Sequence, residues 1–169
     1  MHEVRSNVGR RAIGGGRRIR AIRCHPLTRL RGTGSAMTHT PVIRPLILLV
    51  EDDTDARLLY ATELEMAGLA VIQAGDGDVA LRLAITNRPA VVVSDLALPG
   101  LDGAALAEQL QTDEHTRHIP VIALTGWAGP DVTEAAARSG VVELLTKPCS
   151  AERLVSTVLR YLGPTIPVR

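Results

Sequence analysis

The acidic residues of this sequence that could take part in chemistry stand at the ends of short apolar segments. Glu51, Asp52 and Asp53 directly follow LILLV, and Asp95 ends the segment VVVSD. Carboxylates that lie close together repel one another unless protons or a cation neutralise them. Mg²⁺ suits such a group because it prefers oxygen ligands and usually keeps waters or phosphate oxygens in its shell. The pattern therefore indicates phosphoryl chemistry with a divalent cation.

Two further polar side chains follow apolar segments and could complete such a site. Thr125 comes after PVIAL, and Lys147, with Pro148 behind it, comes after VVELLT. A hydroxyl and an ammonium can balance the charge on a transferring phosphoryl group, and a carboxylate can be the nucleophile. Each residue alone has an ordinary structural explanation, and Asp53 in particular suits the cap of a following helix. Together they indicate a site, in which Asp95 is the best-placed nucleophile.

Short apolar segments alternate with longer amphipathic ones from residue 46 onward. We predict strands at 46–50, 69–74, 90–94, 120–124 and 141–145, and helices at 54–67, 77–87, 103–112, 130–138 and 150–162. Most of the strands are apolar at successive positions, which is typical of a parallel sheet covered on both faces. Such βα alternation predicts a doubly wound α/β fold, which binds ligands at the carboxyl ends of its strands.

The predicted helices are bounded by residues that suit those positions. Gly68 and Gly140 follow two of them, and Ser150 can cap the last. The last helix also carries a single apolar stripe, formed by Leu154, Val155, Val158, Leu159 and Leu162. We expect this stripe to face the core.

Length and composition favour one cytoplasmic domain. The chain has 169 residues, of which 46% are hydrophobic, and this suffices for one ordinary core. No run approaches the roughly 18 apolar residues of a membrane span, so membrane insertion is not expected. Cys24 and Cys149 are far apart in unlike contexts, which favours neither a disulfide framework nor a metal site.

The amino-terminal segment differs in charge from the rest of the chain. Residues 1–36 carry nine Arg against the single acid Glu3, whereas residues 37–169 carry ten basic residues against seventeen acidic ones. We predict a disordered Arg/Gly-rich extension over 1–40. It could contact nucleic acid or an acidic partner, act as a transit peptide, or lie upstream of a natural start at Met37.

Four motifs together resemble the receiver domain of two-component response regulators: LILLVEDD, SDLALPGLDG, ALTG and LLTKP. The resemblance covers residues 45–163 and leaves a short tail at 164–169. It implies a flavodoxin-like five-stranded parallel sheet of strand order 2-1-3-4-5, with helices on both faces. No output domain follows, so we expect a stand-alone receiver.

The resemblance also implies a phosphoacceptor and a set of metal ligands. Asp95 would accept the phosphoryl group and, with Asp52, bind Mg²⁺ directly. Glu51 would bind the ion through water, and the backbone carbonyl of Ala97 would complete the protein ligands. Arg57 stands where the family's first helix often has Arg. This match supports the alignment of Glu51 and Asp52 with the family's acid pair, and it leaves Asp53 outside the ligand set.

Other residues of the family's site have matches in this chain. Thr125 resembles the switch hydroxyl that moves toward the phosphoryl oxygen, and Lys147 would pair with the phosphate. The bond between Lys147 and Pro148 is implied to be cis. Gly103 resembles the glycine that ends the acceptor loop, where a side chain would hinder the turn.

Three positions bear on the switch and on the lifetime of the phosphorylated state. Leu144 replaces the family's aromatic switch residue, so this chain departs from the family's pattern for coupling Thr125 to the distal face. Ala97 and Trp127 flank the path of the hydrolytic water in the family. Ala97 cannot orient a water and Trp127 could cover the site, so we expect slow loss of the phosphoryl group. Trp127 could instead pack or contact a partner.

Other classes of protein fit fewer of these residues. GDGDVA, Gly75 to Ala80, matches a dinucleotide-binding pattern, but Asp76 and Asp78 would repel the pyrophosphate at the helix N-terminus. DTD, Asp53 to Asp55, superficially resembles a haloacid-dehalogenase-type phosphatase motif, but Arg57 stands where that motif has Thr. The last alternative is a receiver-like interaction module that acts without phosphorylation. Leu144 favours it, because it replaces the aromatic switch residue of the family.

We therefore expect a response regulator that receives its phosphoryl group on Asp95 from a histidine kinase or histidine phosphotransfer protein. Beyond Mg²⁺-dependent self-phosphorylation and autodephosphorylation, no enzymatic activity is expected. Phosphorylation would shift a two-state equilibrium at the fourth helix, fifth strand and fifth helix, and so change affinity for an unidentified protein target. A homodimer is left open.

Overall fold

Five strands and five helices alternate strictly along residues 44–163, which are the residues described by the computed structural model. The strands are β1 (Leu46–Val50), β2 (Ala70–Ala74), β3 (Val91–Asp95), β4 (Val121–Thr125) and β5 (Val141–Thr146). The helices are α1 (Thr54–Met66), α2 (Gly77–Asn87), α3 (Gly103–Thr112), α4 (Pro130–Arg138) and α5 (Ala151–Leu162). Each predicted boundary lies within one residue of the observed one.

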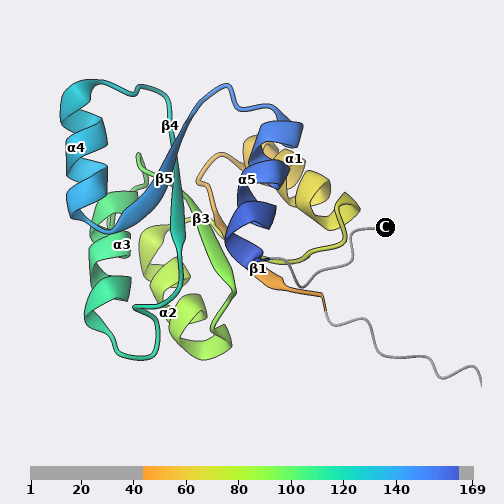
Figure 1. Cartoon of the computed structure of the whole chain (residues 1–169), viewed down its shortest axis with the longest axis horizontal. Helices are drawn as coiled ribbons and strands as arrows, with labels where there is room; N and C mark the ends of the chain where they lie inside the picture. Colours follow the sequence, from red (N-terminus) through yellow and green to blue (C-terminus); the bar gives the residue numbers. More distant parts are fainter. Residues whose placement is uncertain (1–43, 164–169) are drawn as a thin grey trace, which may run out of the picture. The chain divides into compact units, whose positions relative to one another are not determined.

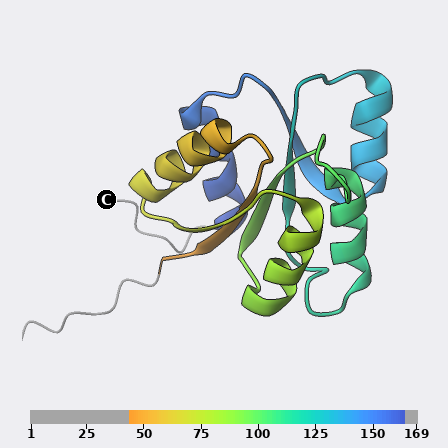
Figure 2. The same ribbon diagram turned by 180° about the vertical axis from the view of Figure 1, so that it is seen from behind.

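All five strands are parallel and lie in the order β2-β1-β3-β4-β5, as the resemblance implied. Helices α1 and α5 cover one face of the sheet, and α2, α3 and α4 cover the other (Figures 1 and 2). The alternation of side chains along β1 gives each face its own core. Ile47 and Leu49 pack with residues of α1 and α5, whereas Leu48 and Val50 pack with residues of α2 and α3.

Side-chain caps begin four of the five helices. Asp53, Asp76, Asp102 and Ser150 each accept a hydrogen bond from the backbone N–H three residues later. Gly68 and Gly140 follow α1 and α4 with φ values of 87° and 89°, a backbone conformation that favours glycine. The predicted caps and helix ends are thus confirmed.

The strands differ in burial according to their place in the sheet. Every residue of β3 and β4 is buried, and so are four of the five in β1. β2 and β5 form the two edges and are partly exposed. The expected covering of both faces is confirmed, since β2 and β5 also contribute residues to the cores on both sides of the sheet although they are partly exposed at its edges.

Several expectations fall on residues that the structure does not describe. These are the extension over 1–40 with its Arg cluster, the start at Met37, Cys24, and the tail at 164–169. Within residues 44–163, no helix combines the length and the hydropathy needed to cross a bilayer.

Candidate functional site

Three carboxylates meet where β1 and β3 end. These strands are neighbours, with Val50 paired to Ser94, so the residues that follow them lie at one edge of the sheet (Figure 1). One oxygen from each of Glu51, Asp52 and Asp95 lies within 4.8 Å of the others. Glu51 and Asp95 are buried, whereas Asp52 is exposed. The structure therefore brings together the three acids that the sequence analysis selected.

Lys147 reaches this cluster from the end of β5. Its Nζ donates to Glu51 Oε2 at 2.5 Å and to Asp95 Oδ2 at 2.6 Å. Partial burial alone would lower the pKa of Lys147, but the hydrogen bonds to Asp95 and Glu51 outweigh it and hold the pKa above its usual value. The lysine is therefore an ammonium. Its bond to Pro148 is cis.

The charges of this cluster do not balance within the chain's own side chains. One ammonium faces three carboxylates, and burial raises the pKa of Glu51 above its ordinary value; Asp95 and Asp52 add to this rise although Lys147 opposes it. Clustered carboxylate oxygens are the ligands that a small divalent cation such as Mg²⁺ prefers. Glu51, Asp52 and Asp95 thus fit a magnesium ion in donor type and spacing.

Arg57 holds the backbone of the acidic segment from α1. Its guanidinium donates to the carbonyl oxygens of Glu51 at 2.5 Å and of Asp52 at 3.2 Å. The sequence analysis used Arg57 only to set the register and did not predict these contacts, because they depend on the path of the loop. Asp53 points elsewhere: its carboxylate accepts from the backbone of Ala56 at 2.8 Å and caps α1.

The loop after β3 is fitted closely around Asp95. Asp95 Oδ1 accepts from the backbone N–H of Ala97 at 2.9 Å. The N–H of Gly103 donates to the carbonyl of Leu96 at 3.1 Å, and a Cβ at Gly103 would overlap the carbonyl oxygen of Asp95. Gly103 therefore occupies a place where no side chain fits. The contribution of the Ala97 carbonyl to metal binding stays a prediction.

Thr125, at the end of β4, is buried and bonded to its own loop. Its hydroxyl donates to the carbonyl of Trp127 at 2.8 Å and accepts from the N–H of Trp127 at 3.2 Å. The Trp127 side chain itself is 73% exposed. Leu144 lies on β5 and is half-buried. The sequence indicated Thr125 and Trp127 separately, and the hydrogen bonds between them were not predicted.

The glycine-rich segment before α2 has a structural explanation. Asp76 accepts from the N–H of Val79 at 2.7 Å and so occupies the helix N-terminus with a carboxylate. A Cβ at Gly77 would overlap the carbonyl oxygen of Leu101 in the neighbouring loop. Helix capping and close packing therefore account for the residues that match the dinucleotide-binding pattern.

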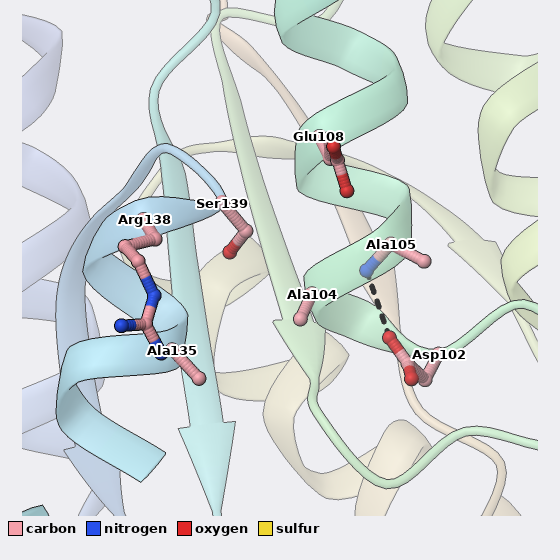
Figure 3. A pocket seen from close by; sticks show the side chains of 7 residues that line it. All are labelled: Asp102, Ala104, Ala105, Glu108, Ala135, Arg138 and Ser139. Atoms are coloured by element: carbon pink, nitrogen blue, oxygen red, sulfur yellow. Dashed lines mark hydrogen bonds between the residues drawn. The ribbon is translucent and has the colours of Figure 1, made fainter. Parts of the chain in front are cut away.

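A hollow of about 360 Å³ lies between α3 and α4 (Figure 3). It is lined by Asp102, Ala104, Ala105, Glu108, Ala135, Arg138 and Ser139. None of the predicted site residues belongs to this lining. The predicted site residues instead gather where the strands end, at one edge of the sheet.

Comparison with known proteins identifies the family. The family model of the response regulator receiver domain matches residues 47–159. The polar-differentiation response regulator DivK of Brucella anthropi is 33% identical over 117 residues, which are 69% of this chain and 95% of DivK.

Solved structures agree with this match. The chain is similar to the Francisella response regulator 1452 receiver domain, with a TM-score of 0.66 and 31% identity over 70% of this chain and 97% of that one. It is also similar to the receiver domain of a sensor histidine kinase from Pseudomonas aeruginosa, whose active-site cleft coordinates a magnesium ion. That likeness has a TM-score of 0.68 and 30% identity, over 72% of this chain and all of that one. The matching segment, the sheet order and the clustered acids all agree: this chain belongs to the response regulator receiver domain family of two-component signalling.

Proposed function

We propose that Asp95 accepts a phosphoryl group from a histidine kinase or a histidine phosphotransfer protein. The observation that carries the proposal is the position of Asp95: it ends a fully buried strand, lies within 4.8 Å of two other acids and is hydrogen-bonded to Lys147. A carboxylate oxygen of Asp95 would attack phosphorus. The bond from phosphorus to the donor's imidazole nitrogen would break, and its electron pair would stay on that nitrogen.

Glu51, Asp52 and Asp95, with the backbone carbonyl of Ala97, would hold Mg²⁺. The bound ion would supply positive charge to the oxygens of the transferring group. Lys147 already donates to an Asp95 oxygen, and we expect it to donate to a phosphoryl oxygen once Asp95 is modified. The hydroxyl of Thr125 would provide the second donor. Apart from self-phosphorylation and autodephosphorylation, no enzymatic activity is proposed.

A phosphodonor protein would meet an apolar surface beside the site. Leu58, Leu59 and Met66 are each more than half exposed on α1, whose first turn follows the acidic segment. Leu59 and Met66 are seven residues apart and so lie on the same side of the helix. Exposed apolar groups of this kind are typical of protein contacts. The downstream target would bind at α4, β5 and α5.

Acetyl phosphate with Mg²⁺ tests the phosphoacceptor directly. We expect intact-mass measurement of the full chain to show the gain of one phosphoryl group, and Asp95→Asn to show none. The variant keeps the size of the side chain but loses the nucleophilic carboxylate. An equal mass gain in Asp95→Asn would overturn the assignment of Asp95. No gain in the native chain would favour the alternative, a receiver-like module that acts without phosphorylation.

The same measurement, followed over time after removal of acetyl phosphate, reports the lifetime. The methyl group of Ala97 offers no hydrogen bond to a hydrolytic water, so we expect the phosphoryl group to persist for minutes or longer. Loss within seconds would contradict this expectation. Because Trp127 is largely exposed and lies against Gly129, the expectation depends mainly on Ala97.

A further inference from the structure

Ser94 is a polar residue in the buried middle of the sheet. It stands on β3 directly before Asp95, is 0% exposed and follows three valines. Its register partners are Val50 on β1 and Ala123 on β4, which are both buried and apolar. A hydroxyl in such surroundings costs free energy unless it forms a hydrogen bond. Ser94 therefore needs a hydrogen-bond partner within the sheet.

That partner is the backbone of Asp95. The Ser94 hydroxyl donates to the carbonyl oxygen of Asp95 at 2.9 Å. The N–H on the other side of the same peptide bond belongs to Leu96, and it donates to the carbonyl of Leu124 on β4 at 2.9 Å. A peptide group is planar, so bonds to its oxygen and to its nitrogen together set its orientation. Ser94 and β4 therefore fix the peptide that joins Asp95 to Leu96.

The loop after β3 is built onto this peptide. The N–H of Ala97 donates to Asp95 Oδ1 at 2.9 Å, and the N–H of Gly103 donates to the carbonyl of Leu96 at 3.1 Å. A Cβ at Gly103 would lie 2.1 Å from the carbonyl oxygen of Asp95, so the start of α3 packs directly against the oxygen that Ser94 holds. Rotation of the peptide would move the N–H of Ala97 away from the Asp95 carboxylate.

Two of the proposed Mg²⁺ ligands belong to this part of the backbone. They are the carboxylate of Asp95 and the backbone carbonyl of Ala97. Both oxygens of that carboxylate already have partners, because Oδ1 accepts from Ala97 N–H and Oδ2 accepts from Lys147. Groups that orient metal ligands without touching the metal commonly change metal affinity when they are removed. Ser94 is placed to act in this way, since its hydroxyl bonds to the backbone of Asp95.

Thr116 provides a comparison within the same chain. It is also 0% exposed, and its hydroxyl donates to the carbonyl of Leu110 at 2.8 Å. Thr116 lies between α3 and β4, in the loop that leads to the amino end of β4, whereas the acids gather at the carboxyl ends of the strands. Ser94 and Thr116 thus form the same kind of bond, and Ser94 forms it beside the site.

We propose that Ser94 is a positioning residue for Asp95. Its hydroxyl holds the peptide after Asp95, and this peptide places the Asp95 carboxylate and the Ala97 carbonyl for Mg²⁺ and for the phosphoryl group. Ser94 acts through these two residues and does not itself bind the ion. The inference rests on the phosphorylation of Asp95 and on the Mg²⁺ site proposed above.

Ser94→Ala tests the inference, because it removes the hydroxyl and adds no atom. We expect the dissociation constant for Mg²⁺, measured by titration calorimetry of the full chain, to rise roughly 10-fold. At a Mg²⁺ concentration that saturates each protein, the rate of mass gain from acetyl phosphate should also fall below that of the native chain. Native affinity together with a native rate in Ser94→Ala would overturn the inference.

Two control variants separate positioning from stability. Ser94→Thr keeps the hydroxyl, so it should keep the native Mg²⁺ affinity even where the added methyl group lowers the stability in urea. Thr116→Val removes a buried hydroxyl of the same kind, so it should lower the stability but leave the Mg²⁺ affinity and the phosphorylation rate unchanged. A loss of affinity in either control as large as that in Ser94→Ala would overturn the inference.

Failure of the proposed function gives a different result. If the native chain gains no mass while Ser94→Ala binds Mg²⁺ more weakly than the native chain, the phosphoacceptor is overturned and the positioning of the metal ligands by Ser94 stands. If the native chain gains mass and Ser94→Ala equals it in affinity and rate, the role of Ser94 is overturned and the phosphoacceptor stands.

Discussion

Asp52 and Asp53 are adjacent and chemically identical, yet their carboxylates have different surroundings. Asp53 accepts a hydrogen bond from Ala56 N–H at 2.8 Å and caps α1. Asp52 shares the acidic cluster with Glu51 and Asp95. The backbone between the two residues directs their carboxylates to different places. Arg57 holds this backbone, because its guanidinium donates to the carbonyl oxygens of Glu51 and Asp52.

Substitutions at these two aspartates are expected to have different effects. Asp52→Asn removes a charged oxygen ligand, so Mg²⁺ affinity measured by titration calorimetry should fall at least as much as the roughly 10- to 100-fold typical of outer-shell changes. Asp53→Ala should lower the free energy of unfolding by about 1 kcal/mol, as measured by denaturant titration.

Asp53→Asn is the matched control, because asparagine caps helices about as well as aspartate. It should keep both the stability and the Mg²⁺ affinity of the native chain. If Asp53→Asn weakened Mg²⁺ binding as much as Asp52→Asn, the assignment of Asp53 as a helix cap outside the Mg²⁺ ligand set would be wrong.

At the scale of elements, α2 meets the loop between β3 and α3 at Gly77. A Cβ at this position would overlap the carbonyl oxygen of Leu101, which is backbone and cannot turn aside as a side chain could. We expect Gly77→Ala to lower the free energy of unfolding by about 1–3 kcal/mol, the usual cost of overpacking. Gly126→Ala is a suitable control, since nothing lies within 4 Å of a Cβ there. Equal stability of the two variants in urea would contradict this account of the packing.

The boundaries of the elements could be predicted because each is marked locally. Apolar runs, capping residues such as Ser150 and helix-ending glycines such as Gly68 are visible in the sequence and were confirmed to within one residue. The exposure of β2 and β5 could not be predicted in the same way. It follows from their positions at the edges of the sheet, which the strand order implied by the family resemblance gives but the apolar character of a single strand does not reveal.

The candidate site could be predicted as a set of residues but only partly as a set of contacts. Strand ends of a parallel sheet meet at one edge, so the convergence of Glu51, Asp95 and Lys147 follows from the topology. The contacts of Arg57 with the acidic segment and of Thr125 with Trp127 depend on loop conformations. Nothing in the spacing of these residues specifies such conformations.

At the scale of the whole molecule, charge is unevenly placed. Residues 37–169 carry seventeen acidic side chains against ten basic ones, and three of the acids crowd one edge of the sheet. A cation that binds there stabilises the folded chain, since the unfolded chain has no such cluster. At a concentration 100 times its dissociation constant, the gain in unfolding free energy is about 2.7 kcal/mol.

Thermal unfolding should therefore respond to Mg²⁺ in particular. We expect Tm to rise with MgCl₂ well beyond the change seen in NaCl of the same ionic strength, because NaCl only screens the acids. Asp52→Asn should show a smaller rise. Equal Tm values in the two salts would argue against a specific cation site.

The burial pattern of the sheet also places the two sides of the site in different surroundings. Asp95 ends β3, which is buried throughout and lies between β1 and β4. Lys147 follows β5, which is an edge strand and is partly exposed to solvent. Asp95 is therefore held in the buried middle of the sheet, whereas Lys147 is held at one of its edges. We expect amide hydrogen exchange to be slower in β3 than in the two edge strands, β2 and β5, and equal rates in all three would contradict this difference.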